Sequence, residues 1–264
     1  MSRQDRLTRI LEIVVEKGNI EVEDIALELN VSMATIRRDF DSLAKRQLLS
    51  RTHGGAVATG GSLGLPLTYK MAKDDEVKLR IAEAAAQMVG RYDIIGINGG
   101  TTTTAVARAI VARQEFAPSD PNETQPALTV VTNAVNIAAE LTVRHQIKIV
   151  VTGGVARPQS YELTGPFAEE VLKEVNIDIA FLGVDAIDSV IGAAAHHEDE
   201  ARVNRQIAAR ARKIVVVTDS TKFSKSAFAS ICPVNEIDVL ITDDGLEKSV
   251  IEKFRAMGVE IVIV

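Results

Sequence analysis

Seven short runs rich in isoleucine and valine alternate with amphipathic stretches from residue 92 onward, and this alternation limits the possible fold more than any other feature. The runs are Ile94–Ile97, Leu128–Val131, Ile147–Val151, Ile179–Val184, Ile214–Val217, Val239–Ile241 and Val259–Val264. Helical spacing is found at Thr104–Val111, Glu169–Val175, Glu200–Arg212 and Glu247–Met257, and another helix is expected over residues 75–88. Apolar strands that alternate with helices predict an α/β domain whose mostly parallel sheet is covered on both faces.

The residues before this domain have a different pattern, which predicts three short helices and a β-ribbon. The first two helices follow from apolar residues at helical spacing, namely Leu7, Ile10, Leu11 and Val14, then Val22, Ile25, Ala26 and Leu29. The third begins at Ser32, a favourable N-cap, and continues with Ile36, Phe40 and Leu43 on one face. Two extended pieces around Gly54 complete a winged helix-turn-helix over residues 1–57, a mainly helical fold that binds DNA.

The outward face of the third helix and the ribbon carry the residues that we expect to contact DNA. At about 100° per residue, Arg37 and Arg38 fall opposite the apolar stripe. The predicted contacts are Ser32, Thr35, Arg37 and Arg38 from the helix, and Arg51 and His53 from the wing. Paired arginines also occur on faces that meet only solvent. A helix-turn-helix used only for protein contact is the alternative, and exposed arginines fit it poorly.

The local distribution of charge favours DNA binding, although the whole chain has a net charge of −6. Residues 32–58 contain five basic and two acidic side chains, whereas residues 2–31 contain four basic and seven acidic ones. Positive charge is therefore concentrated at the predicted recognition helix, which is what matters for phosphate contact. Because the excess is small for one copy, we expect a homodimer or homotetramer to bind double-stranded operator DNA.

Glycines and a proline between the two predicted domains indicate a linker over residues 58–74, so that the α/β domain comprises residues 75–264. Three prolines among polar residues at 114–127 predict an exposed loop.

The only cysteine, Cys232, excludes an intramolecular disulfide and fits a reducing compartment. The first residues are read as a helix and not as a targeting peptide, and no apolar run has the length of a membrane span. We therefore expect a cytoplasmic protein.

Polar or glycine-rich turns follow four of the predicted strands, and Asp185 follows a fifth, at the strand ends where ligands of parallel α/β sheets bind. Glycines let the backbone approach an anion, and the free N–H groups at a helix start can hold it. Lys222 can add a positive charge for a phosphate, and Asp185 can accept hydrogen bonds from sugar hydroxyls. Glycines after strands are often plain turns, but several on one edge favour a small phosphorylated or polyhydroxy ligand. Its predicted contacts are Asn98, Gly99, Gly100, Thr101, Thr102, Thr132, Asn133, Gly153, Gly154, Asp185 and Lys222.

The sequence contains no pattern that predicts catalysis, a metal site or a cofactor. The turn after Asn98 lacks the third glycine of a dinucleotide fingerprint, and no P-loop is present. The run His196–Glu200 lacks the ligand spacing of a His-Glu-x-x-His site, and its acidic residues suit the first turn of a helix. No Ser-His-Asp or Cys-His arrangement suggests itself, although a single sequence leaves a spatial one open.

Several of these motifs together resemble the DeoR family of bacterial transcriptional regulators. In the N-terminal part the resemblance lies in VSMATIRRDF at Val31–Phe40 and in Arg51–Ala56. In the C-terminal part it lies in Lys78 with Ile81-Ala82, Gly100–Thr102, Val131–Asn133, Gly153-Gly154, Ala180–Gly183 and Asp219–Phe223. The resemblance implies a winged helix, a sensor domain related to sugar-phosphate isomerases, a phosphorylated sugar or sugar intermediate as effector, and repression of a catabolic operon.

The chain also departs from the family pattern at three places. Asn98 stands where aspartate is usual, Ala186 stands where glycine is common, and the loop at 114–127 is longer. The same resemblance suggests an alternative, a sugar-phosphate isomerase, because Gly183–Asp188 and Ser220–Lys222 look like parts of a ribose-5-phosphate isomerase site. The glycine-rich loop of those enzymes is missing, since alanines follow Gly192. We therefore expect ligand binding without turnover.

Overall fold

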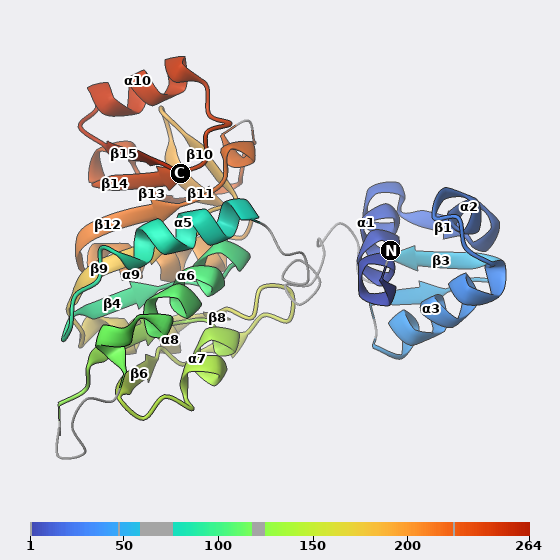
Figure 1. Ribbon diagram of the computed structural model, residues 1–264, viewed down its shortest axis with the longest axis horizontal. Coiled ribbons are helices and arrows are strands. Elements are labelled where there is room, and N and C mark those ends of the chain that lie inside the picture. The colour runs from blue at the N-terminus through green and yellow to red at the C-terminus, as the bar shows by residue number, and fades with distance from the viewer. Residues whose placement is uncertain (1, 47, 59–75, 118–124, 224) are drawn as a thin grey trace. The chain divides into compact units, whose positions relative to one another are not determined.

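The computed structural model describes residues 2–46, 48–58, 76–117, 125–223 and 225–264. The chain divides into two compact units, Met1–Asp74 and Asp75–Val264, and each is described by itself (Figure 1). The linker predicted for residues 58–74 lies outside the described residues, except for Ala58, which ends a strand. Within the described ranges, no helix is long and apolar enough to cross a membrane.

The N-terminal unit contains the three predicted helices and the ribbon. Its elements are α1 (Arg3–Lys17), β1 (Asn19–Glu21), α2 (Val22–Glu28), α3 (Met33–Lys45), β2 (Leu49–Arg51) and β3 (Gly55–Ala58). Ser2 and Asp5 form a capping box at the start of α1, and Gly18 ends that helix at a φ of 74°. The apolar faces of the three helices close around one core, in which Ile10, Ile25, Ile36 and Phe40 are fully or almost fully buried.

Strand β1 was not predicted, and it turns the ribbon into a three-stranded antiparallel sheet of order β1-β3-β2. Ile20 lies opposite Ala56 and is the only buried residue of this three-residue strand. A strand with a single apolar residue gives no alternating pattern. Gly55 is required by this pairing, because a Cβ there would collide with the Ile20 carbonyl oxygen.

The C-terminal unit is built on a parallel sheet of seven strands in the order β15-β14-β12-β9-β4-β5-β6. All seven predicted apolar runs are strands of this sheet: β4 (Ile94–Ile97), β5 (Leu128–Thr132), β6 (Ile147–Val151), β9 (Ile177–Leu182), β12 (Ala211–Val217), β14 (Val239–Thr242) and β15 (Glu260–Ile263). The helices are α5 (Glu76–Ala86), α6 (Thr101–Ala112), α7 (Val135–Leu141), α8 (Pro166–Lys173), α9 (Glu198–Ala209) and α10 (Lys248–Ala256). The short α7 was not predicted.

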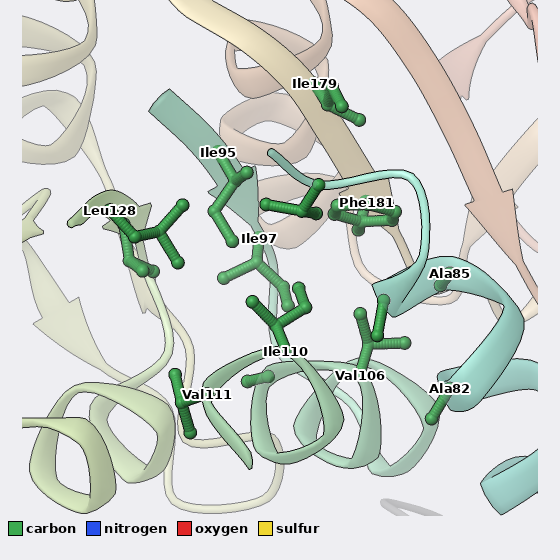
Figure 2. Packing of buried hydrophobic residues seen from close by; sticks show 14 of the residues in the cluster. Ala82, Ala85, Ile95, Ile97, Val106, Ile110, Val111, Leu128, Ile179 and Phe181 are labelled. Carbon is green, nitrogen blue, oxygen red and sulfur yellow. The ribbon is translucent and has the colours of Figure 1, made fainter. Parts of the chain in front are cut away.

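Successive residues of the central strands face two different hydrophobic cores, as expected for a sheet covered on both sides. Ile179 and Phe181 pack with α5, α6 and α7, whereas Ala180 and Leu182 pack with α8, α9 and Phe254 of α10. Figure 2 shows the first core, in which side chains of α5 and α6 lie over β4 and β9. The prediction of a parallel α/β sheet covered on both faces is therefore confirmed.

Smaller elements lie around the main sheet. A hairpin of β7 (Val155–Ala156) and β8 (Leu163–Thr164) follows β6. A second antiparallel sheet contains β10 (Ala186–Asp188), β11 (Gly192–Ala195) and β13 (Ala229–Cys232). Three 3-10 turns are described: η1 (Gln114–Phe116), η2 (Ser220–Lys222) and η3 (Val234–Glu236). None of these strands is longer than four residues, so the sequence pattern did not separate them from loops.

The predicted exposed loop at 114–127 is wrong in its first part. Phe116 is fully buried in the core, and the Arg113 guanidinium lies 5.5 Å from the centre of its ring. Residues 118–124 lie outside the described residues. An isolated aromatic residue carries no periodic signal, and only the packing of η1 against α6 reveals its burial.

Candidate functional sites

The outward face of α3 presents the side chains that were predicted to contact DNA. The Ser32 hydroxyl accepts a hydrogen bond from the Thr35 backbone N–H at 3.2 Å, and the two side-chain hydroxyls lie 2.9 Å apart. Arg37 and Arg38 are exposed on the side opposite Ile36. A helix with two exposed guanidinium groups near its start can reach phosphates and the acceptor edge of guanine in the major groove.

Arg51, at the end of β2, contacts the recognition helix instead of extending away from it. Its Nη1 donates to the Arg37 carbonyl oxygen at 3.3 Å and lies 3.4 Å from Asp41 Oδ1. The same guanidinium lies 5.6 Å from the centre of the Phe40 ring. Arg51 therefore ties the wing to α3, whereas His53 is exposed in the turn between β2 and β3.

Asp39, on the same helix, was not singled out by the sequence, and it is buried at 2% exposure. Arg6 of α1 donates to Asp39 Oδ2 at 2.6 Å, and Arg3 lies 3.7 Å from the other oxygen. This ion pair fixes α1 against α3. The signal was available, because Asp39 lies three residues after Ile36 and thus on the apolar face.

In the C-terminal unit, the five predicted loops follow five neighbouring strands, β12, β9, β4, β5 and β6. Because these strands are parallel, the loops share one edge of the sheet. The strand order reverses between β4 and β9, and open α/β sheets bind ligands at such a point. With strands about 4.8 Å apart, five strand ends span about 19 Å, which is wider than one sugar phosphate. A single small ligand therefore contacts only part of the predicted set.

Two of the predicted ligand residues at this reversal hold the loops together. Asn98 is 1% exposed, and its Nδ2 donates to the Gly183 carbonyl oxygen at 3.0 Å while its Oδ1 accepts from the Gly183 N–H at 2.8 Å. An ionised aspartate could make only the second bond, which explains how asparagine suits this position. The Thr132 hydroxyl similarly donates to the Ile97 carbonyl oxygen at 2.7 Å and accepts from the Ala134 N–H.

The start of α6 is the part of this edge best suited to an anion. Gly100 is its N-cap with a φ of 139°, and no side chain caps the helix. Thr101 and Thr102 form the first turn of this twelve-residue helix. The Thr104 hydroxyl is turned inward and donates to the Gly100 carbonyl oxygen at 2.6 Å. An uncapped helix start of this kind presents backbone N–H groups to a phosphate.

Glu162, which the sequence did not single out, lies beside this turn at 4% exposure. It is carried by the β7–β8 hairpin, whose Leu163 N–H donates to the Asn133 carbonyl oxygen at 2.7 Å. A Cβ on Gly99 would collide with Glu162 Cγ and lie 2.7 Å from its Oε1. Gly154, which directly precedes β7, lets the two sides of the hairpin approach, because a Cβ there would lie 2.5 Å from the Thr164 carbonyl oxygen. Gly153 (φ 75°) precedes it in the turn after β6.

Two amides surround the Glu162 carboxyl group. Asn133 and Asn204 donate to its Oε2 at 3.2 and 3.3 Å, and the Asn133 amide also donates to Asn204 Oδ1. Burial raises the pKa of Glu162 to about 8, and the charges of Glu200 and Asp185 add to the rise. The two amide hydrogen bonds oppose this shift without cancelling it.

The remaining predicted residues lie on the other side of the reversal. Asp185 is half-buried, and its Oδ2 accepts from the His196 backbone N–H at 2.9 Å. Lys222 ends the turn η2, which Asp219 caps by accepting from the Thr221 N–H at 3.0 Å. Asp243 accepts from the Ser220 N–H at 2.7 Å and fixes the same turn.

The acidic residues after His196 form the first turn of α9. Glu198 and Asp199 are exposed in its first turn, while the buried Glu200 accepts from Arg157 at 2.8 Å and from Ser160 at 2.6 Å. In the described part of the chain, no group of three or more His, Cys, Asp or Glu side chains is arranged to hold a metal ion.

Known protein families match both units. Residues 6–60 match the DeoR-like helix-turn-helix domain, and residues 73–244 match the DeoR C terminal sensor domain. The HTH-type transcriptional regulator GlpR of Haloferax volcanii is 34% identical over 260 residues, which cover 98% of this chain and 96% of that protein. The glycerol-3-phosphate regulon repressor of Escherichia coli K12 is 29% identical over 243 residues, 92% of each chain.

Solved structures are similar only over part of the chain. Ribose 5-phosphate isomerase A from Neisseria gonorrhoeae has a TM-score of 0.40 at 19% identity, covering 58% of this chain and 55% of that one. A sor operon regulator from Shigella flexneri has a TM-score of 0.40 at 13% identity, covering 69% and 89%. Similarity at this level says nothing about the ligand of this protein.

The family matches agree with the geometry, in which one unit is shaped to meet DNA and the other to hold a small molecule. This is the organisation of an effector-responsive transcription factor. The chain belongs to the DeoR family and is a transcriptional repressor. Its relatives are named as transcriptional regulators and not as enzymes, which decides against the isomerase alternative.

Proposed function

We propose that this repressor controls a carbohydrate-catabolism operon and responds to a phosphorylated sugar or sugar intermediate. The observation that carries the proposal is the uncapped start of α6 at the reversal of strand order, where the half-buried Gly100 is the N-cap. The Escherichia coli relative is named for the regulon of glycerol 3-phosphate, which is a small phosphorylated polyol.

In this proposal, the phosphate binds the N–H groups of the first turn of α6, with Thr101 and Thr102 as further donors and Lys222 as a cation. Asp185 accepts from hydroxyls of the same ligand. The predicted residues Asn98, Thr132, Gly153 and Gly154 act indirectly, because their contacts shape the loops. Asn133 acts beside the phosphate site, where its amide donates to Glu162 and its buried Oδ1 is an available acceptor.

For DNA recognition, two copies insert α3 into successive major grooves of the operator, and Thr35, Arg37 and Arg38 contact bases or phosphates. Ser32 lies at the start of the helix and His53 in the wing turn, where both can reach the DNA backbone. Arg51 positions α3 through Phe40 and Asp41. The effector changes operator affinity only by the difference between its binding free energies to the two arrangements of the protein.

Thermal-shift measurements with sugar phosphates and their dephosphorylated counterparts test the effector proposal, because a ligand of the folded state raises its apparent stability. Lys222→Ala should weaken binding of the phosphorylated compound and leave the dephosphorylated one unchanged. Lys248→Ala, at the exposed start of α10, is the matched control. Equal losses for both compounds in Lys222→Ala would contradict the phosphate contact.

A further inference from the structure

We propose that the side chains around Glu162 bind an ammonium group, so that the effector is an amino-bearing sugar phosphate. This inference rests on the proposed function, because it concerns the other end of the same ligand. We name Asn133, Glu162, Glu200 and Asn204 the acceptor cluster. They come from the loop after β5, the β7–β8 hairpin and α9, and all four are at most 7% exposed.

The acceptor cluster has more acceptors than donors. The Asn133 and Asn204 amides each donate to Glu162 Oε2, and the Asn133 amide also donates to Asn204 Oδ1. Asn133 Oδ1 is buried and accepts no hydrogen bond from any described residue. An unpaired buried acceptor is costly, so the cluster is completed by a ligand that brings donors.

The charges in the cluster favour a cationic donor over a hydroxyl. Glu200 is paired with Arg157 at 2.8 Å, whereas the hydrogen bonds described for Glu162 come only from neutral amides. Glu200 and Asp185 both act on Glu162 with negative charge. An ammonium group supplies three donors and a positive charge that favours the ionised form of Glu162, whereas a hydroxyl supplies one donor and no charge.

Gly99 connects this cluster to the phosphate site. Its missing side chain makes room for Glu162, and the next residue, Gly100, is the N-cap of α6. A phosphate at the start of α6 and an amine at Glu162 are therefore close enough to belong to one small molecule. The ligand class that fits is a hexosamine phosphate or a similarly short phosphorylated amino polyol.

Matched ligand pairs test this inference on the full chain. Calorimetric titrations would compare glucosamine 6-phosphate with glucose 6-phosphate, and galactosamine 6-phosphate with galactose 6-phosphate. We expect an amine to bind about 10-fold to 100-fold more tightly than its hydroxyl partner, the range of a charged hydrogen bond. Glu162→Gln should abolish that preference, and the exposed Glu174→Gln should keep it.

A second readout needs no variant. Near pH 7.5 Glu162 binds a proton, since its pKa is about 8, and an ammonium that ionises it should release that proton. Titrations in two buffers of different ionisation enthalpy would detect the release for the amine and not for its hydroxyl partner. Equal affinities and no proton release would overturn the amine site and leave the phosphate site standing. If none of the four phosphates binds, both proposals fail.

Discussion

Asp39 in the DNA-binding unit and Glu162 in the sensor unit are both buried acidic side chains, but among the described residues only Asp39 has a cationic partner. Asp39 in the DNA-binding unit is 2% exposed and lies 2.6 Å from Arg6. Glu162 in the sensor unit is 4% exposed and is bonded to two neutral amides. Removing a carboxylate from water is costly unless another charge compensates it.

The difference reflects what each unit does. Neutralising Asp39 internally joins two helices and leaves Arg37 and Arg38 on the outside, where they can meet DNA. Glu162 has no cationic partner among the described residues and holds a proton up to a pH of about 8, so in our proposal an ammonium ligand ionises it and supplies the compensating charge. A carboxylate paired with an arginine of the same fold, such as Asp39, stabilises the structure. A carboxyl group without such a partner, such as Glu162, can instead bind a cationic ligand.

The largest effect is expected from removing the exposed arginines. Arg37→Ala with Arg38→Ala should reduce operator affinity to the non-specific level, a loss of about 10³-fold or more. The free energy of unfolding should change by less than about 0.5 kcal/mol, because both side chains are on the surface. Fluorescence anisotropy with operator DNA and denaturant titration measure the two quantities. Normal operator binding by the double variant would refute the role of α3.

The next largest effect is a loss of stability, which should be greater for the buried ion pair of Asp39 than for the exposed ion pair of Asp41 on the same helix. Asp39→Ala should destabilise the DNA-binding unit by about 3 kcal/mol, the lower end of the range for a buried pair, because Arg6, whose side chain is 14% exposed, loses its partner. Asp41→Ala, which removes the exposed pair with Arg51, should cost at most about 1 kcal/mol. Denaturant unfolding of the two variants gives the comparison, and similar losses would show that burial of Asp39 is not decisive.

The pH dependence of the sensor unit tests the other carboxylate. Burial raises the pKa of Glu162 from 4.5 to about 8, so the folded state holds this proton more tightly than the unfolded state. Its contribution to stability is therefore present at low pH and is lost as the pH rises towards 8. Between pH 5.5 and 8.5, the wild type should lose about 3 kcal/mol relative to Glu162→Gln.

Thermal unfolding of the full chain at several pH values measures this difference. Glu174→Gln, an exposed substitution of the same kind, should follow the wild type. A wild type and a Glu162→Gln variant with parallel pH profiles would mean that Glu162 is ionised in the fold and already compensated.

The smallest effect is expected at Arg51, which contacts α3 and was first predicted to contact DNA. Arg51→Ala should weaken operator binding by about tenfold or less without changing the slope of log K against log salt concentration. Loss of a true phosphate contact lowers that slope by about one. Arg38→Ala is the comparison, and a reduced slope for Arg51→Ala would assign Arg51 to the DNA backbone.

The sequence predicted the main framework of this protein because periodic patterns describe it well. All seven runs became neighbouring strands of one sheet, and Ser32, Ile36 and Phe40 defined α3 as expected. It failed at β1, at the β10-β11-β13 sheet and at Phe116. These elements have at most four residues or one apolar side chain, and their stability comes from distant partners.

For the candidate sensor site, the sequence predicted which loops lie together, but it did not predict the hydrogen bonds that their side chains make. The glycines and polar residues at strand ends lie along one edge of the sheet, as predicted, because parallel strands end together. Whether Asn98 faces a ligand or binds Gly183 depends on a residue 85 positions away, which no local pattern records.

The sequence alone determined which segments form helices and strands, and therefore a three-helix unit with exposed arginines and an α/β unit with polar strand ends. Local periodicity and capping are enough for that, since they depend on residues within a few positions. Only the tertiary structure decided which partner each buried acidic side chain has. It pairs Asp39 with Arg6 and places Glu162 between the amides of Asn133 and Asn204. Burial and electrostatic compensation depend on neighbours brought together by folding.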